Sequence, residues 1–307
     1  MIDFIIFIIS ISALIKGADL VIKEAERIAL KFNIPEFIIG ASLIAFGTSL
    51  PEMAASISAT LNNKPEMAVG NVIGSVIFNI ALVLGLVFLL SKKIEPKRDI
   101  FERDSVWSLI PIFTFILIVY DNQITRFEGV VFIALMFSYL YFLSKENVIS
   151  EEVNEDLKKE SLSWPKTIVF LLIGFILVVV GAEYTIESAS NLAKFFGVSE
   201  WIISLILIAL GTSLPELVVS VVASLKNKGE MAIGNIIGSN VANFTMVLGS
   251  ASVVKPLNVN ILEYSFDILT ALIVSILLIF ITANKMYNKS AGIALLSILI
   301  LFLYNSI

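Results

Sequence analysis

The sequence predicts an all-α polytopic membrane protein with ten transmembrane helices, arranged as two inverted-topology five-helix repeats. Three observations support this prediction. Hydrophobic residues make up 58% of the 307 residues, and the mean hydropathy of +0.95 is far above that of soluble domains. Ten apolar segments, each near the ~20 residues that span a bilayer, can be marked off along the chain. Motifs of the first half also return in the second half at a constant offset of 164 residues.

The ten segments follow one another through short loops, apart from one longer polar stretch after the fifth. Their limits are 2–28, 34–61, 67–90, 104–120, 126–143, 165–192, 198–225, 231–254, 264–282 and 287–305. The first and sixth are long and carry polar residues towards their C-terminal ends, so we expect them to tilt in the membrane or project from it. The first segment lacks a basic start and a small-residue cleavage site, which indicates a retained helix.

The polar stretch divides the chain into three parts. Residues 1–143 form an N-terminal five-helix repeat, 144–164 a cytoplasmic linker loop, and 165–307 a C-terminal five-helix repeat, all within one integrated membrane domain. The linker has four acidic residues between positions 151 and 156. Their spacing lacks the glycine and ligand pattern of a Ca²⁺-binding loop, which favours a solvated acidic loop over a regulatory Ca²⁺ site.

The distribution of Lys and Arg predicts the orientation of the chain. If the N-terminus lies outside, the cytoplasmic loops and helix ends hold sixteen of these residues. The outside then holds four, namely Lys64, Arg126, Lys194 and Lys255. Because cytoplasmic loops are enriched in positive charge, we expect a multi-pass protein of the cell membrane with both termini extracellular.

The residue types that are absent exclude several classes of protein. The sequence has no Cys and no His, which removes disulfides, thiol chemistry, His-ligated metals and His proton relays. An enzyme would be left with acid-pair chemistry alone, so we predict that the protein is not an enzyme and has no cofactor. No basic stripe suggests a nucleic-acid partner, and no obligate protein partner is evident; the bilayer is the expected surrounding.

The second apolar segment contains the string GTSLPE at residues 47–52. A carboxylate at membrane depth costs about 3 kcal/mol on insertion scales unless it has a partner, so Glu52 marks a functional site. Pro51 has no N–H and clashes with the carbonyl of Gly47, so the helix should break before Glu52 and leave the carbonyls around Ala45 to Thr48 without their helical partners. Such carbonyls are tolerated where they are buried or line a cavity. Carboxylate, hydroxyl and carbonyl oxygens together suit Ca²⁺ or Na⁺.

The same string returns at residues 211–216, where Glu216 matches Glu52. The structural alternative is a proline kink whose carboxylate pairs with a basic residue, but neither broken segment contains Lys or Arg. Each half holds five segments, an odd number, so the halves enter the membrane from opposite sides. Interrupted helices at matching positions of an inverted repeat indicate a substrate site near the midplane and alternating access, although a channel can share this architecture.

A second motif follows in the third and eighth segments. Polar residues four positions apart form one stripe on each helix: Asn71, Ser75 and Asn79, repeated as Asn235, Ser239 and Asn243. Amides and hydroxyls provide oxygen ligands without adding charge. The alternative is interhelical hydrogen bonding, which is favoured most for Asn71 and Asn235.

Two further matched features accompany these stripes. Gly70 and Gly74, with Gly234 and Gly238, form GxxxG pairs that predict close helix approach. The acids Asp19 and Glu183 also match, and we leave them out of the core site because a headgroup or gate role is at least as reasonable for them. Lys16, three residues before Asp19, is a candidate partner for that carboxylate.

These motifs resemble the α-repeats of the sodium/calcium exchanger family, within the Ca²⁺/cation antiporter superfamily. GTSLPE followed by GNVIGS and Asn79, then GTSLPE followed by GNIIGS and Asn243, carry the resemblance, which is to the prokaryotic type with two α-repeats and covers essentially the whole chain. It implies that Glu52 and Glu216 bind Ca²⁺ and share in Na⁺ binding. It also implies that the first and sixth helices slide past the rest to open each side in turn.

The resemblance implies a wider set of metal ligands as well. The backbone carbonyls of Thr48 and Thr212 would complete the Ca²⁺ site. Flanking Na⁺ sites would use Ala45, Ser49 and Ser75 from one half, and Ala209, Ser213 and Ser239 from the other. Asn79 and Asn243 complete the candidates; some relatives carry Asp at the position of Asn243, and an amide there argues against K⁺ dependence.

The function expected from these features is secondary antiport of Na⁺ and Ca²⁺ by alternating access, with both ions using a shared midplane site. H⁺/Ca²⁺ exchangers of the superfamily usually carry an acid in the second motif, where this chain has Gly74 and Ser75, so Na⁺ is the expected counter-ion. The alternatives are an H⁺/Ca²⁺ antiporter and a cation channel.

Overall fold

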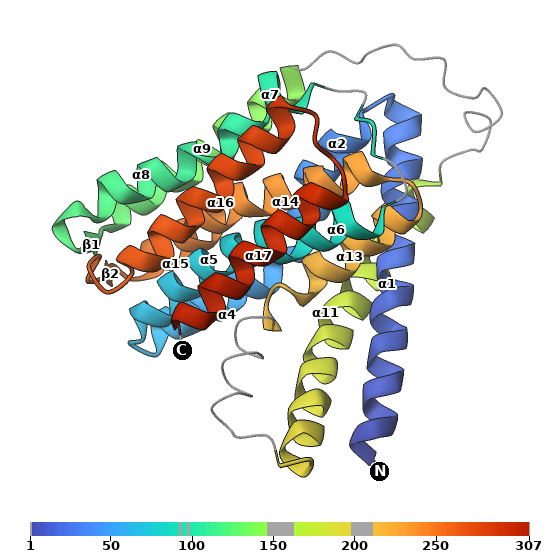
Figure 1. Ribbon diagram of the computed structural model, residues 1–307, viewed down its shortest axis with the longest axis horizontal. Coiled ribbons are helices and arrows are strands. Elements are labelled where there is room, and N and C mark those ends of the chain that lie inside the picture. Colours follow the sequence, from blue (N-terminus) through green and yellow to red (C-terminus); the bar gives the residue numbers. More distant parts are fainter. Residues whose placement is uncertain (1, 92–93, 97–98, 146–162, 198–210, 307) are drawn as a thin grey trace.

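The structure is a computed structural model that describes residues 2–91, 94–96, 99–145, 163–197 and 211–306. Within these ranges the chain is helical apart from its loops and two short strands (Figure 1). The strands β1 (Gln123–Ile124) and β2 (Leu257–Asn258) pair antiparallel between the two halves of the sequence. The predicted all-α class is therefore confirmed.

Each predicted apolar segment is helical over its described residues, although several segments are built from consecutive pieces. The first half comprises α1 Ile2–Phe32, α2 Glu36–Ile39, η1 Gly40–Ile44, α3 Ala45–Thr48, α4 Leu50–Leu61, α5 Pro65–Phe78, η2 Asn79–Leu84, α6 Gly85–Leu90, α7 Ile100–Arg103, η3 Ser105–Ser108, α8 Ile110–Ile118, η4 Val119–Asp121 and α9 Arg126–Lys145. The second comprises α11 Trp164–Phe195, α13 Leu214–Leu225, α14 Gly229–Ala242, η5 Asn243–Val247, α15 Leu248–Val254, α16 Ser265–Ala283 and α17 Lys289–Ser306.

Among the described residues, six helices are long and apolar enough to cross a membrane. A seventh span results if the pair Glu36–Thr48 and Leu50–Leu61, bent by 41° at its break, is counted as one. Three other predicted segments contain shorter apolar helices, Ser105–Asp121, Leu214–Leu225 and Lys289–Asn305. The chain is thus a multi-pass membrane protein. Most of the predicted linker loop, residues 146–162, lies outside the described part.

The helices α1 and α11 run side by side, antiparallel, and at a steep angle to the other helices (Figure 1). Glycines allow the contact, since a Cβ added to Gly17 would lie 2.7 Å from the carbonyl oxygen of Gly174. The start of α1 meets the end of α11, where Asn191 donates a hydrogen bond of 3.0 Å to Asp3. We call this end the N-terminal face. At the opposite face, the rings of Phe32 and Trp164 lie 5.6 Å apart.

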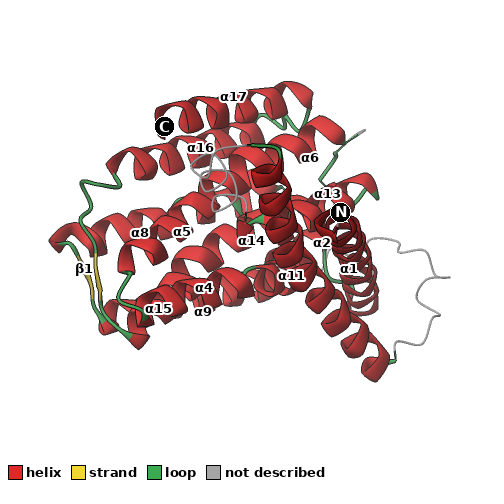
Figure 2. Cartoon of the chain, turned by 90° about the horizontal axis from the view of Figure 1, so that it is seen from below, coloured by secondary structure: helices red, strands yellow, loops and turns green. Residues whose placement is uncertain are grey.

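The helix α14 forms the centre of the protein and lies between the pair α16 and α17 on one side and α9 and α15 on the other (Figure 2). Every residue of α14 except Glu230 is buried. Its glycines touch the backbone of the first broken segment: a Cβ on Gly238 would lie 2.3 Å from the Ala41 carbonyl oxygen, and one on Gly234 the same distance from that of Phe37. The prediction of close approach is confirmed for this glycine pair.

The matching pair, Gly70 and Gly74, makes no comparable approach to any described residue. By the offset of 164, the backbone that these glycines would face belongs to residues 198–210, which lie outside the described part. The prediction of close approach therefore stays a prediction for this pair.

Candidate functional site

The first broken segment is interrupted where proline chemistry predicts. The helix α3 ends at Thr48, and α4 begins at Leu50 with Pro51 in its first turn. Ser49 between them has φ −85° and ψ 2°. Because Pro51 has no N–H, the carbonyl of Gly47 lacks its helical partner. Glu52 is consequently placed in the first turn of α4, where the helix dipole favours a negative charge.

One expected detail of this break is wrong. The carbonyl of Ala45 does not lose its partner, because it accepts a hydrogen bond of 3.0 Å from the Ser49 N–H. The hydroxyl of Thr48 donates a longer one of 3.3 Å to the same oxygen. The next backbone hydrogen bond across the break joins the Met53 N–H to the carbonyl of Ser49 at 3.1 Å. Ala45 and Thr48 are both fully buried.

The second break repeats the first. Ser213 has φ −87° and ψ 3°, and α13 begins at Leu214 with Glu216 in its first turn. Thr212 lies just before the break and is partly buried, whereas its match Thr48 is fully buried. The predicted site residue Ala209 lies outside the described residues.

The two breaks bring Glu52 and Glu216 together in the interior. Both side chains are fully buried, and their carboxyl groups interact electrostatically with each other. Ser49, from the first half, donates a hydrogen bond of 3.1 Å to Glu216 Oε1. The hydroxyl of Ser239 lies 3.5 Å from the same oxygen. Two acids from distant parts of the sequence thus share one buried pocket.

Several buried polar atoms of the pocket have no hydrogen-bond partner among the described residues, and they include the amide nitrogens of Asn240 and Asn243. The oxygens without a donor are both of Glu52 and Oε2 of Glu216, together with Ser75 Oγ, Ser213 Oγ, Asn79 Oδ1 and Asn243 Oδ1. All belong to the residues that the sequence singled out. Buried polar atoms are normally paired, so this cluster of unpartnered oxygens around two acids indicates a place for cations.

The asparagines Asn79 and Asn243 each begin a π-helical turn, η2 and η5. A π turn inserts one residue into an α-helix and occurs frequently at functional sites. The turn η5 packs against α4, which carries Glu52, and η2 packs against α13, which carries Glu216. Each asparagine is therefore brought next to the helix of an acid. A third π turn, η1, leads into Ala45.

The first residue of each polar stripe, Asn71 or Asn235, makes hydrogen bonds that link separate helical segments. Asn71 donates a hydrogen bond of 3.1 Å to Ser56 Oγ and accepts one of 3.0 Å from Thr212. Asn235 donates one of 3.0 Å to Ser220 Oγ, and Thr48 Oγ1 lies 3.5 Å from its Oδ1. Each asparagine joins the second helix of its own half to the break of the other half. This arrangement supports the structural interpretation of Asn71 and Asn235.

Sequence reasoning missed Asn240. It is buried and accepts a hydrogen bond of 3.0 Å from Asn79 Nδ2. Asn79 Oδ1 is then left without a donor among the described residues. The match of Asn240 in the first half is Val76, so a search for repeated residues passes over it. Its position one residue after Ser239 was the available signal.

Replacing Asn240 by leucine is expected to lower the free energy of unfolding by about 1–3 kcal/mol, because Asn79 Nδ2 would remain buried without its acceptor. Thermal unfolding of the purified protein in detergent measures this. The variant Asn305→Leu, at an exposed position near the end of α17, is the control and should change stability by less than about 0.5 kcal/mol. Unfolding of Asn240→Leu at the wild-type temperature would contradict the assigned contact.

The backbone at position 47 leaves no room for a side chain larger than that of glycine. An added Cβ would lie 2.1 Å from the ring of Phe175 on α11. The long helix α11 therefore rests directly on the turn that precedes the first break. A displacement of α11 has to change the packing around the pocket.

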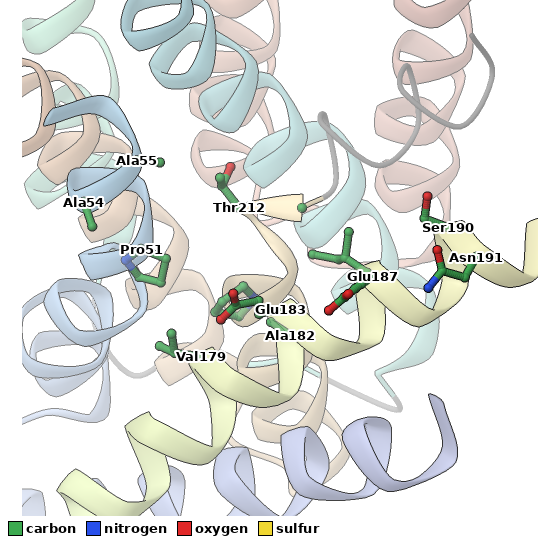
Figure 3. Close-up of a pocket in the computed structure, with 13 residues that line it drawn as sticks. Pro51, Ala54, Ala55, Val179, Ala182, Glu183, Glu187, Ser190, Asn191 and Thr212 are labelled. Carbon is green, nitrogen blue, oxygen red and sulfur yellow. The ribbon is translucent and has the colours of Figure 1, made fainter. Parts of the chain in front are cut away.

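A cavity of about 780 Å³ leads from the two breaks towards the N-terminal face (Figure 3). Its walls include Pro51, Ala54 and Ala55 on one side and Thr212 and Pro215 on another. The third wall is α11, from Val179 to Asn191, with Glu183 and Glu187 on successive turns. The cavity reaches Pro51 and Pro215, each one residue before an acid, whereas Glu52 and Glu216 themselves are buried.

Comparison with known proteins agrees with this site. The family model for sodium/calcium exchanger proteins matches residues 2–145 and 166–307. The sodium/calcium exchanger MaX1 of Methanosarcina acetivorans is 30% identical over 98% of this chain and 97% of its own. An uncharacterised membrane protein of Methanocaldococcus jannaschii is 35% identical over 96% of this chain and 95% of its own.

Solved structures agree as well. The sodium-calcium exchanger NCX_Mj, soaked with Na⁺ and Ca²⁺, is 33% identical and superposes with a TM-score of 0.81 over 98% of this chain and 97% of its own. The fold of the two proteins is the same. The chain is a membrane transporter, not an enzyme, and belongs to the sodium/calcium exchanger family.

Proposed function

We propose that the protein exchanges Na⁺ for Ca²⁺ across the membrane by alternating access, with both ions using one pocket around Glu52 and Glu216. The observation that carries the proposal is the meeting of two buried acids from two broken helices, amid oxygen atoms that lack donors. Oxygen-rich sites of this kind suit hard cations. The relatives named sodium/calcium exchangers support the choice of ions.

In the proposed site the two carboxylates bind Ca²⁺, with the carbonyls of Thr48 and Thr212 completing its shell. The flanking Na⁺ sites use neutral oxygens from each half: Ala45, Ser49, Ser75, Ala209, Ser213 and Ser239. Asn79 and Asn243 add amide oxygens next to the acids. This assignment follows the family resemblance, and the cluster of unpartnered oxygens at Glu52, Ser75, Ser213 and both asparagines supports it.

Exchange follows from charge. One Ca²⁺ neutralises two carboxylates, whereas Na⁺ ions do so by occupying several sites together. Both cations need the same glutamates, so their occupancies exclude each other. Two bare carboxylates in a low-dielectric interior are costly, and the ion-free pocket should therefore resist reorientation. Movement in either direction then requires one ion type or the other.

We further propose ten transmembrane helices in two inverted repeats, residues 1–143 and 165–307, joined by a cytoplasmic linker at 144–164, with both termini outside. Matched positions differ in burial in a way that supports alternating access. Ala55 is exposed in the cavity, whereas its match Val219 is 1% exposed. Ile186 is partly exposed, whereas its match Ile22 is 1% exposed. The N-terminal face is then open, and the opposite face closed.

This asymmetry favours a transporter over the channel alternative. A conducting channel needs a path that reaches both faces at once. The described cavity opens to the N-terminal face, and on the opposite side α1 packs directly along α13. The long pair α1 and α11, which touches the turn at Gly47 through Phe175, is the element that we expect to move against the rest.

Ca²⁺ uptake into proteoliposomes should follow an imposed Na⁺ gradient and be at least about tenfold slower with a pH gradient in Na⁺-free buffer, a ratio that corresponds to 1.4 kcal/mol. The reason is that the described residues of the pocket include no acid beyond Glu52 and Glu216. Radioactive Ca²⁺ flux with Na⁺, K⁺ and H⁺ gradients varied separately measures this. Equal rates with Na⁺ and pH gradients would favour the H⁺/Ca²⁺ antiporter. Uptake without any counter-gradient would favour the channel.

A further inference from the structure

A group of ion pairs joins α1 to the second half of the chain on the closed, opposite face. Lys226, at the end of α13, pairs with Asp19 of α1. Lys228, in the short loop before α14, lies 2.5 Å from Glu26 of α1 and 2.6 Å from Glu36 at the start of α2. Two separate lysines of one loop thus hold two positions along the same face of α1.

Lys228 is the more buried of the two lysines, with 22% of its side chain exposed. Burial lowers the pKa of Lys228, but hydrogen bonds and charge attraction from Glu26 and Glu36 outweigh this effect and raise the pKa above its ordinary value. The lysine therefore remains charged at neutral pH. Glu36 fixes it to the start of α2, which packs on the central helix α14, and Glu26 extends the contact to α1.

The repeat matches of these five residues belong to the N-terminal face, and they do not keep all of the charges. The matches of Asp19 and Lys226 are Glu183 and Asn62, so that pair loses its positive partner. The matches of Glu26 and Lys228 are Ser190 and Lys64, so that pair loses its negative partner. Only the pair of Glu36 with Lys228 keeps opposite charges in its matches, Glu200 and Lys64. Of the three ion pairs on the opposite face, one therefore has a match of opposite charges on the N-terminal face.

We propose that Lys226 and Lys228, with Asp19, Glu26 and Glu36, form an ionic latch that holds the opposite face closed and biases the Na⁺-loaded protein towards the state open at the N-terminal face. The proposal rests on the alternating access proposed above. When α1 parts from α13 to open the opposite face, the contacts to Asp19 and Glu26 break. The N-terminal face, with fewer charged matches, closes without equal compensation.

The absence of cysteine from the sequence permits a direct test. Val219→Cys, in the closed face, and Ala55→Cys, in the open cavity, are repeat matches and would each carry the one thiol of the protein. Their rates of reaction with a hydrophilic methanethiosulfonate reagent are compared in detergent, at constant ionic strength, with saturating Na⁺ and without Ca²⁺, because the Na⁺-loaded protein is the one expected to reorient. Each is measured with and without the double change Lys226→Gln and Lys228→Gln.

Breaking the latch is expected to raise the labelling rate of Val219→Cys by about threefold to tenfold, the scale of a few partly exposed ion pairs. Labelling of Ala55→Cys should fall by less than about twofold, because the state open at the N-terminal face remains the major one. Lys64→Gln, the match of Lys228 on the other face, is the control; Lys64 is exposed, and its loss should leave the Val219→Cys rate unchanged.

A charge swap tests whether the contact between residues 19 and 226, and not either charge by itself, keeps the opposite face closed. Asp19→Lys alone places like charges together and should speed Val219→Cys labelling, and adding Lys226→Asp should restore the slow rate. An unchanged rate in the double glutamine variant, a rise at both reporter positions, or a swap that fails to restore the slow rate overturns the latch. Absence of Na⁺-driven Ca²⁺ uptake by the wild type instead overturns the proposed function, which the labelling assay does not measure.

Discussion

Replacing Glu216 by glutamine is expected to abolish Na⁺-driven Ca²⁺ uptake, and Glu52→Gln should do the same. Each change removes one of the two buried negative charges on which the divalent ion depends. Loss of one partner from a buried ion pair costs about 3–5 kcal/mol, which corresponds to at least about a hundredfold in affinity. Ca²⁺ flux in proteoliposomes and isothermal titration of the purified protein both measure the effect.

Glu66→Gln is the matched control for these variants. Glu66 is also in the first turn of a helix, α5, but its side chain is exposed. Its replacement should leave uptake within about twofold of the wild type, as expected for a surface change. Full uptake by Glu52→Gln or Glu216→Gln would remove that acid from the ion site.

Replacing Gly238 by valine is expected to cause the largest loss of stability. A Cβ at this position would lie 2.3 Å from the backbone oxygen of Ala41, and backbone cannot rotate away as a side chain can. Overpacking of a buried contact costs about 1–3 kcal/mol, and more where backbone must move. The affected backbone is η1, which leads into Ala45, so the ion site should be displaced as well. A lower midpoint of thermal unfolding in detergent and weaker Ca²⁺ binding measure the two effects.

A graded series makes this prediction sharper. Gly238→Ala should be destabilising but milder than Gly238→Val, because it adds the Cβ alone. Ala54→Val adds comparable bulk at an exposed position of the cavity wall and should change stability by less than about 0.5 kcal/mol. If Gly238→Val unfolds at the same temperature as Ala54→Val, the backbone contact is not as close as described.

The parts of the fold that depend on local chemistry could be predicted from the sequence. Pro51 and Pro215 lack an N–H, and this alone places the two breaks and puts Glu52 and Glu216 in first turns. The constant offset of 164 residues identified the matching acids and stripes. That Glu52 and Glu216 meet was also predictable, because interrupted helices at matching positions of an inverted repeat line one site near the midplane.

Other features lacked a signal in the sequence. The π turns at Asn79 and Asn243 have no side-chain signature, since one extra residue per turn leaves the composition unchanged. Asn240 was missed because its match is valine. Lys16, the basic residue nearest to Asp19 in the sequence, was the predicted partner of that carboxylate. In the structure Asp19 pairs instead with Lys226, 207 positions further along the chain. Tertiary packing sets such partnerships.

The π turn at η2 makes the packing of α6 independent of the direction in which the Asn79 side chain points. A regular helix would couple the two. Beyond it, α6 packs on α17 through Gly85, where an added Cβ would lie 3.0 Å from Leu296. In an unbroken α-helix, the rotation that best fits this neighbour would also dictate where Asn79 points. The extra residue changes the angular phase between the two. A substitution that changes how α6 fits α17 therefore need not change the direction in which the amide of Asn79 points.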